Sequence, residues 1–422
     1  MQTPMHMSRD EKIRITKHGD VRLTPSQRRR WGLAAGAEVF LRETAQGLLL
    51  VPTAPPLTRV YVEPTTACNL SCGACVRRSW REPEGYMDIG LYRQLADALG
   101  QVPTLRSMAF WGIGEPLLHP HIAEMVQLGH KLGAKTEVIT NGLLLSRNVA
   151  DALVEAGLDT LVVSIDGTSA QTQAEMRSGA DLRLVEQNIN GLHRSRYARR
   201  LAGPEVGIEF VVSRRNVAEL PNLRRLAFSL GATFIVLSNV LPYSEEFKDD
   251  ILYWLAASNL YTKPHTRWFP EIHFPRMDAR PESLTPLMGL LRHSGSLDLP
   301  EKQPAESSAY CRFVNEGALA VRWDGDVSPC IALMHSYNCF VLGRQKSIRR
   351  YALGNVGRED IRSIWEREEY RQFRARVRGF EFSPCVDCGG CFMSESNEED
   401  CFGNTFPTCG DCLWAHGIIV CP

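Results

Sequence analysis

The sequence predicts an α/β protein, a partial (β/α)6 barrel that follows a small β-rich domain and precedes a Cys-rich domain. Three observations carry this prediction. Strand-like and helix-like runs alternate six times between residues 57 and 240. Short strand-like runs punctuated by glycine fill residues 12–52, and seven of the 13 cysteines lie in the last 38 residues. We therefore predict domains at 1–56, 57–300 and 301–422.

Composition excludes several classes of protein. The 48 basic and 48 acidic side chains cancel, which argues against attraction of the whole chain to nucleic acid or to an anionic membrane. No stretch approaches the roughly 18–20 apolar residues that span a bilayer, and the first 15 residues lack the apolar core of a signal peptide. We expect a cytoplasmic protein whose cysteines are reduced thiolates that hold metal.

Residues 12–52 contain four strand-like runs separated by Gly19, Gly36 and Gly47. This pattern resembles the AbrB/SpoVT-like swapped-hairpin domain, in which two strand pairs form half of an intertwined dimer. The resemblance implies a homodimer formed through this domain. Members of that family often bind DNA through basic residues, and a dimerisation or protein-docking module is the alternative. The two prolines of TAPP at 53–56 predict a linker.

Six strands are predicted in the barrel, and amphipathic segments such as 88–100 and 120–133 predict the helices between them. The strands are expected at 59–65, 105–112, 135–142, 159–167, 205–213 and 232–240. Successive βα units imply a parallel sheet with right-handed crossovers. Ligands of such sheets gather at the carboxyl ends of the strands. Residues 241–300 predict a bridging segment and show no chemistry of their own.

A CxxxCxxC loop, TTACNLSCGACVRR, follows the first predicted strand. Thiolates from Cys68, Cys72 and Cys75 suit three irons of a [4Fe-4S] cluster, and the loop offers no ligand to the fourth iron. That iron is then open to a small molecule. A structural zinc site is the main competitor, but zinc loops normally pair two CxxC knuckles.

With this loop at the first strand end and WGIGEP at the second, the sequence resembles radical S-adenosylmethionine (radical SAM) enzymes. The resemblance implies that the open iron chelates AdoMet, and that the reduced cluster cleaves it to a 5'-deoxyadenosyl radical. Gly114, Glu115 and Pro116 match the family's GGEP motif, where backbone atoms approach the methionine ammonium. Ile113 replaces the first glycine of that motif. Ala74 stands where the family often has an aromatic residue near adenine.

Polar residues also follow the third and fourth strands. Ser164 and Asp166, two residues apart in SIDG, point the same way from an extended chain and resemble the family's ribose motif. Arg177 resembles the arginine that pairs with the AdoMet carboxylate, with a solvated surface arginine as the alternative. Asn141 either faces the same pocket or only makes the turn. Adenine is expected near residues 236–238.

The tail resembles the SPASM or twitch type of auxiliary-cluster domain, because Cys311, Gly325 and Cys330 have the spacing of its opening. Ten cysteines remain after the first loop, enough for two four-cysteine clusters with two to spare. The predicted ligands are Cys311, Cys330, Cys385, Cys388, Cys391, Cys401 and Cys421, with Cys409 or Cys412 as the eighth. Cys339 is the expected spare cysteine. A structural zinc ribbon is the alternative.

The full chain resembles maturases associated with tungsten-cofactor oxidoreductases of the aldehyde ferredoxin oxidoreductase type. This implies modification of a tungstopterin enzyme or its cofactor, so the substrate is a protein, peptide or pterin-type molecule. A low-potential donor such as ferredoxin or flavodoxin is expected to reduce the first cluster. The alternatives are a SPASM enzyme that modifies ribosomal peptides, a DNA-binding regulator that senses redox state through clusters, and a zinc-ribbon interaction protein.

Overall fold

The protein is described here from a computed structural model. The structure describes residues 14–15, 17, 21–25, 27–28, 39–44, 47–52, 55–80, 82–254, 261–262, 271–273, 275–291, 309–383, 385 and 391–421. The chain forms two compact units, Met1–Pro56 and Leu57–Pro422. In the first unit, the described strands form two antiparallel pairs. They are β1 (Arg14–Ile15) with β2 (Val21–Arg22), and β3 (Val39–Thr44) with β4 (Gly47–Pro52).

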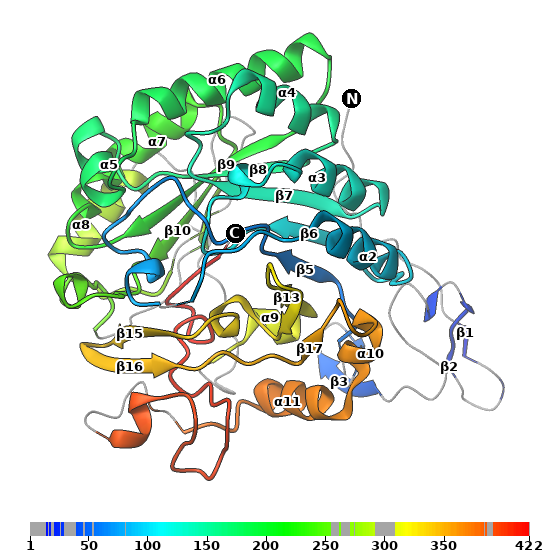
Figure 1. The fold of residues 1–422 in the computed structure, drawn as a ribbon. Coiled ribbons are helices and arrows are strands. Elements are labelled where there is room, and N and C mark those ends of the chain that lie inside the picture. The colour runs from blue at the N-terminus through cyan, green and yellow to red at the C-terminus, as the bar shows by residue number, and fades with distance from the viewer. Residues whose placement is uncertain are drawn as a thin grey trace. The chain divides into compact units, whose positions relative to one another are not determined.

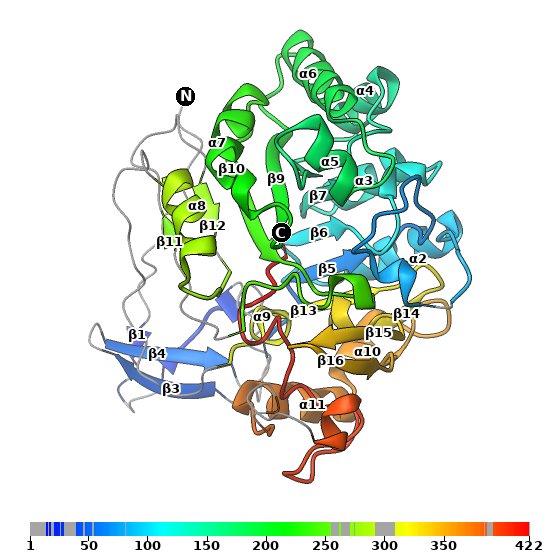
Figure 2. The same ribbon diagram turned by 90° about the vertical axis from the view of Figure 1, so that its left-hand side faces the viewer.

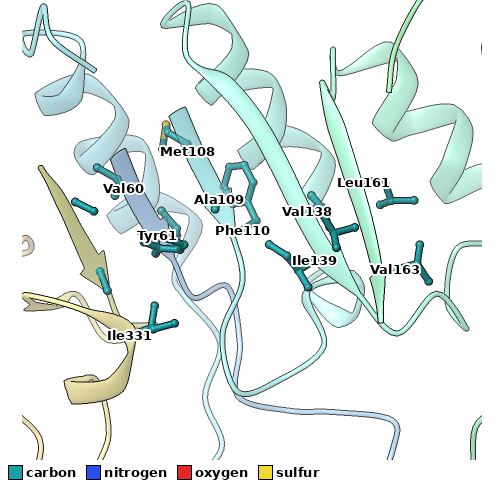
Figure 3. Close-up of a cluster of buried hydrophobic side chains, with 14 of the residues drawn as sticks. Val60, Tyr61, Met108, Ala109, Phe110, Val138, Ile139, Leu161, Val163 and Ile331 are labelled. Carbon is teal, nitrogen blue, oxygen red and sulfur yellow. The ribbon is translucent and has the colours of Figure 1, made fainter. Parts of the chain in front are cut away.

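The second unit is built on a sheet in which six consecutive parallel strands lie in chain order, as the sequence predicts (Figure 1). These are β5 (Arg59–Val62), β6 (Ser107–Phe110), β7 (Lys135–Thr140), β8 (Thr160–Ser164), β9 (Glu205–Val212) and β10 (Phe234–Asn239). Each lies inside its predicted range. Parallel strands buried on both faces need apolar side chains on both sides. Val60, Phe110, Val138 and Val163 are accordingly fully buried in the core between sheet and helices (Figure 3).

Helices cover the outer face of the curved sheet (Figures 1 and 2). They are α2 (Ile89–Leu99), α3 (Ile122–Lys131), α4 (Arg147–Glu155), α5 (Ala170–Met176), α6 (Leu182–Ala198) and α7 (Leu220–Ser229). Helix α2 begins where the Asp88 side chain accepts a hydrogen bond from the Leu91 N–H, and α4 begins at Ser146 in the same way. Such caps satisfy backbone donors that a helix leaves free. Leu95 and Leu99 then face the core.

The C-terminal region continues the barrel sheet. Strand β13 (Ala318–Val321) pairs in parallel with β5, and β14 (Asp326–Ser328) and β17 (Gly354–Asn355) follow it to the edge. The remaining elements are the hairpin β15 (Tyr337–Val341) with β16 (Arg344–Ile348), and the helices α9 (Arg312–Asn315), α10 (Ile361–Glu366) and α11 (Glu368–Gly379). Short 3-10 turns lie at Ile331–Leu333 and Phe392–Glu395. The chain end returns to β10, where the Val420 N–H donates to Ser238 Oγ at 3.1 Å.

The bridging segment is described in part. Strands β12 (Glu271–His273) and β11 (Tyr261–Thr262) add to the sheet beside β10, and α8 (Pro281–Leu291) packs on α7. Among the described helices, none has both the length and the apolar character needed to cross a bilayer.

Candidate active site

A cavity of about 290 Å³ lies at the carboxyl ends of the six parallel strands. Each strand end contributes lining residues, as expected for a parallel sheet. The lining includes Glu63 after β5, residues 111–115 after β6, Thr140 and Asn141 at the end of β7, Ser164 and Asp166 from β8, Glu209 and Val211 from β9, and residues 238–241 from β10. The sequence motifs at successive strand ends therefore meet in one place.

The cysteine loop forms one wall of this cavity, because Cys68, Cys72 and Cys75 all line it. Burial, together with the neighbouring thiolates of Cys75 and Cys68, raises the pKa of the Cys72 thiol to about 11. Arg177 opposes this shift and favours the thiolate. The loop thus gathers three thiols beside a buried guanidinium, which is a suitable setting for thiolate ligands once a metal cluster replaces their protons.

Gly114 allows the backbone of the GEP turn to lie very close to the backbone of the segment that precedes Cys68. A Cβ on Gly114 would lie 2.4 Å from the Thr65 carbonyl oxygen and 2.5 Å from that of Ala67. The next residue, Glu115, donates its N–H to Ala67 O at 2.8 Å. Its buried carboxylate accepts from the Thr140 hydroxyl at 2.6 Å and from the Asn141 N–H at 2.8 Å. Glu115 therefore ties three strand ends together.

Ser164, Asp166, Arg177 and Glu209 form a second connected group in the cavity wall. The Arg177 Nε donates to Asp166 Oδ2 at 2.7 Å, and both side chains are largely buried. Asp166 Oδ1 accepts the Val211 N–H at 2.8 Å, and Ser164 Oγ donates to Glu209 at 3.1 Å. Arg177 is thus a buried partner of Asp166, and the structure does not support the alternative of a solvated surface arginine.

Some of the remaining residues predicted to bind AdoMet line the cavity, and others do not. Asn141 lines the cavity, and its Nδ2 donates to Asn69 of the cysteine loop at 2.8 Å, so it does more than make a turn. Pro116 is not part of the cavity wall and begins the short turn Pro116–Leu118. Ala74 lines the cavity, and the half-buried aromatic ring of Tyr243 also lines it. Within the expected adenine strand, Ser238 lines the cavity and Val236 does not.

Several cavity residues had no signal in the sequence analysis. Burial raises the pKa of Glu209 to about 7, although Arg177 acts to lower it. Asn239 donates through Nδ2 to two backbone carbonyls, while its buried Oδ1 accepts no hydrogen bond from any residue that the structure describes. Glu63 and His335 line the same cavity. An unpaired buried acceptor and several ionisable groups in one cavity are typical of a ligand site.

In the tail, four cysteines lie near one another. Burial raises the pKa of Cys409, and the thiolates of Cys412, Cys311 and Cys330 raise it further. The same neighbours act on Cys330. The structure therefore brings Cys409 and Cys412 together with the opening pair, whereas the sequence assigned only one of the two to a cluster.

The other tail cysteines lie in several different places. Cys385 and Cys401 lie near each other, with Cys401 Sγ 2.9 Å from Ser383 Oγ, and Cys391 follows in the same region. Cys388 lies outside the described residues. Cys421 is predicted as a cluster ligand; it lines the main cavity, where the Trp414 Nε1–H donates to its sulfur at 3.1 Å. Cys339 is buried beside Lys346 and Asp411.

The residues present fit an iron–sulfur cluster with AdoMet. Three thiols face one cavity, a glycine leaves room where backbones meet, and Asn239 Oδ1 is a buried acceptor with no hydrogen-bond partner in the described part of the chain. Among the described residues, no three Cys, His, Asp or Glu side chains are close enough to hold one single metal ion.

Comparison with known families gives two matches. Residues 62–208 match the radical SAM superfamily, and residues 311–392 match the SPASM iron-sulfur cluster-binding domain. A curated relative from Pyrococcus furiosus, the tungsten-containing aldehyde ferredoxin oxidoreductase cofactor-modifying protein, is 30% identical over 378 residues, covering 86% of this chain and 96% of the relative. The PqqA peptide cyclase of Gluconobacter oxydans is 28% identical over 204 residues, covering 46% of this chain and 52% of that protein.

Among solved structures, Streptococcus suis SuiB bound to its precursor peptide SuiA covers 81% of this chain and 73% of its own, with a TM-score of 0.54 and 15% identity. At that identity the likeness shows the fold. Radical SAM domains carry a [4Fe-4S] cluster and use AdoMet, and SPASM domains bind auxiliary clusters. The motifs, the shared cavity and the near full-length relative lead to one conclusion: this chain belongs to the radical SAM superfamily and is an enzyme with a SPASM domain.

Proposed function

We propose that this enzyme matures a tungstopterin aldehyde oxidoreductase by modifying that protein or its cofactor. The observation that carries this proposal is the 30% identity to a tungsten-enzyme cofactor-modifying protein over 96% of that relative's length. The match covers 86% of this chain, so the likeness extends well beyond a single motif.

Within the cavity we assign roles by position. Cys68, Cys72 and Cys75 hold the AdoMet-binding cluster, and auxiliary clusters are held in the tail. When bound, the reduced cluster with AdoMet supplies an organic radical that takes a hydrogen atom from an unactivated C–H bond. The chain's own residues hold AdoMet and exclude water. The methionine end lies against Gly114, Glu115 and Asn141.

Ser164 and Asp166 would hold the ribose of AdoMet, and Arg177 would pair with the carboxylate of its methionine end. A planar guanidinium suits a carboxylate because it donates two parallel hydrogen bonds. Apolar residues line much of the remaining cavity, including Leu70, Ile139, Met176, Leu241, Ile331 and Ile419. This apolar lining limits water and stray hydrogen donors around a reactive radical.

The test uses the reconstituted chain under anaerobic conditions, with dithionite, AdoMet and an aldehyde oxidoreductase isolated from cells that lack this chain. We expect 5'-deoxyadenosine in proportion to oxidoreductase activated, and neither product with Cys72→Ala. A wild-type chain that cleaves AdoMet but leaves the oxidoreductase unchanged in mass and activity would exclude this substrate.

A ribosomal peptide is the second candidate substrate. It is favoured by the similarity to a peptide cyclase and by the shared fold with SuiB, whose structure contains a precursor peptide. Coupled cleavage of AdoMet with a peptide encoded beside the gene, and none with the oxidoreductase, would support it.

We also propose a ferredoxin or flavodoxin as the electron donor and a homodimer formed through an AbrB-like N-terminal unit. The two antiparallel strand pairs in Met1–Pro56 support the latter. Light scattering of the full chain and of a form lacking residues 1–56 tests it, with a dimer expected only for the full chain. A titration with duplex DNA across a salt series should show no salt-dependent binding, which would exclude the regulator hypothesis.

A further inference from the structure

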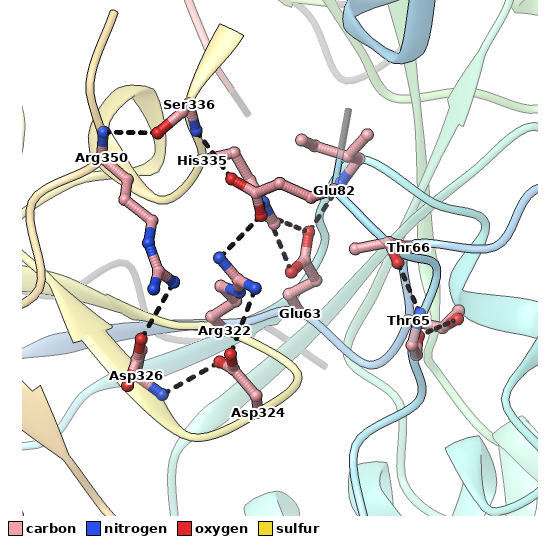
Figure 4. Close-up of polar contacts among 12 residues, drawn as sticks. Glu63, Thr65, Thr66, Glu82, Arg322, Asp324, Asp326, His335, Ser336 and Arg350 are labelled. Atoms are coloured by element: carbon pink, nitrogen blue, oxygen red, sulfur yellow. Dashed lines mark hydrogen bonds and ion pairs between the residues drawn. The ribbon is translucent and has the colours of Figure 1, made fainter. Parts of the chain in front are cut away.

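A buried acid–base cluster lies where the barrel and the SPASM domain meet (Figure 4). Glu63 follows β5, Glu82 follows the cysteine loop, and His335 follows the turn Ile331–Leu333 of the SPASM domain. The His335 and Glu63 side chains are 2% and 0% exposed, and both line the reaction cavity. Residues 272 positions apart in the chain are thus in direct contact.

Both ring nitrogens of His335 face carboxylate oxygens. Nε2 lies 3.0 Å from Glu63 Oε1 and 2.9 Å from Oε2, and Nδ1 lies 3.0 Å from Glu82 Oε2. An ionised carboxylate only accepts hydrogen bonds, so each ring nitrogen that faces one requires a proton. The two nitrogens of the ring therefore need two protons, and the cluster stores one proton more than neutral imidazole carries.

The surroundings fix this arrangement. The Ser336 N–H donates to Glu82 Oε1 at 3.0 Å, and the buried Arg322 lies 2.7 Å from Glu82 Oε2 and 3.1 Å from Asp324. The Trp80 ring packs on the imidazole with 4.8 Å between ring centroids. Glu82 is thus held firmly on the Nδ1 side of the ring.

On the Nε2 side, Glu63 is held by the turn that precedes the GEP residues. The Ile113 N–H donates to Glu63 Oε1 at 3.1 Å. A Cβ on Gly112 would lie 2.4 Å from Glu63 Cγ, so the glycine leaves space for this carboxylate. The turn that faces AdoMet in the family resemblance therefore also seats Glu63 at the cavity.

We propose that Glu63 and His335 are the proton-donating pair of the reaction cavity, with Glu82 as the residue that positions the imidazole. The His335 Nε2 proton moves to the ionised Glu63 carboxylate, and Glu63 delivers that proton to a substrate oxygen or nitrogen that gains negative charge. One N–H bond breaks, one O–H or N–H bond forms on the substrate, and no electron moves along this path. Water restores the Nε2 proton after product leaves.

The charges around His335 favour a ring that holds the proton to be transferred. Burial lowers the pKa of His335, but the hydrogen bonds and charges of Glu63 and Glu82 outweigh it and raise the pKa above 6.5. Burial raises the pKa of Glu82, yet the bonds from His335 and Ser336 and the charge of Arg322 bring it down to about 2. The facing charged groups are therefore Glu63, Glu82 and Arg322, and the ring rests as imidazolium. The proposal rests on the radical SAM activity and not on the identity of the substrate.

The first experiment measures the protonation state of the His335 ring directly. Nitrogen-15 NMR of histidine-labelled, reconstituted protein, with His335 assigned from the missing signals of His335→Gln, should show a doubly protonated ring at pH 7.5. In Glu63→Gln the ring should lose its proton at a lower pH than in wild type. A neutral His335 ring at pH 7.5 in the wild-type chain would overturn the proposal, whatever the substrate.

The second experiment measures turnover of the oxidoreductase substrate. Glu63→Gln and His335→Gln should lower product formation at least about 100-fold, flatten its alkaline pH dependence, and leave iron content and AdoMet binding within twofold. Glu398→Gln, at an exposed ion pair with Arg349, is the matched control and should behave as wild type. Glu63→Gln with the wild-type rate and pH profile would refute the role. If wild type itself leaves the oxidoreductase unchanged, the proposed substrate is wrong, and the NMR result still decides this inference.

Discussion

Gly114 is the position where adding a single methyl group most directly tests the geometry of the cysteine loop. In Gly114→Ala the new Cβ would lie 2.4 Å from Thr65 O and 2.5 Å from Ala67 O, against 3.4 Å for an ordinary contact. Restoring that contact requires a movement of about 1.0 Å (3.4 − 2.4 Å). Both neighbours are backbone atoms of the segment that leads into Cys68, so a rotamer change cannot relieve the contact.

The expected cost has two parts. Overpacking of this kind costs about 1–3 kcal/mol. A shift of about 1 Å would also break the 2.8 Å hydrogen bond from the Glu115 N–H to Ala67 O, which is worth about 1 kcal/mol. The total cost is about 2–4 kcal/mol. We expect it to distort the cysteine loop, because the sheet on the other side of Gly114 is tightly packed.

The assay is iron and sulfide content after anaerobic reconstitution, with EPR of the reduced protein. Three clusters correspond to about twelve irons, and we expect Gly114→Ala to retain about eight, losing the AdoMet-binding cluster and 5'-deoxyadenosine formation. Gly191→Ala is the matched control, since the nearest atom to its Cβ is Arg194 Nη2 at 4.0 Å and alanine favours the helix. A Gly114→Ala protein with full iron content and wild-type AdoMet cleavage would show that the loop does not depend on this close approach.

Three further predictions concern charge and ligand choice. Arg177→Lys should raise the Kd for AdoMet about tenfold or more in equilibrium dialysis, because lysine lacks the planar fork; an unchanged Kd would leave Arg177 only as the partner of Asp166. Burial raises the pKa of Glu209 to about 7 from 4.5, so the folded state binds this proton more tightly than the unfolded chain does. Relative to Glu209→Gln, the wild-type free energy of unfolding should therefore fall as pH rises from about 4.5 to about 7, by at most about 3 kcal/mol; urea titrations in which the difference stays flat would contradict this. Cys409→Ser and Cys412→Ser should each remove about four irons, whereas Cys339→Ser should keep the wild-type content; iron loss in the last variant would reverse the assignment.

The barrel and much of its cavity were predictable because their signals are local. Each strand is a short apolar run that ends in a polar or glycine-containing motif, and a parallel sheet brings such ends together. The strands at Ser107–Phe110 and Thr160–Ser164 lie inside the predicted ranges for this reason. The same logic predicts Asp166 in this pocket and gives Asn141 the pocket as one of two alternatives; both residues line the cavity.

Glu63, His335 and Glu209 escaped prediction because their environment depends on distant chain segments. In the sequence, a glutamate after a strand predicts the start of a loop. The pairing of β5 with β13, which encloses Glu63, cannot be seen from that pattern. Glu209 lies inside a strand, where its neighbours Ser164 and Arg177 come from other βα units. Among the cysteines, spacing alone did not show that Cys421 returns to the cavity while Cys409 and Cys412 stay with Cys311.

The backbone ladder between β5 and β13 constrains how this enzyme can be dissected. Because Leu319 is in register with Val60 at the barrel's first strand, removing everything after residue 300 would leave the inner edge of a parallel sheet unpaired. Exposed edges of that kind recruit other chains, so a truncated barrel is expected to aggregate rather than to yield a smaller working enzyme. Domain exchange between relatives should accordingly keep these two strands from the same parent.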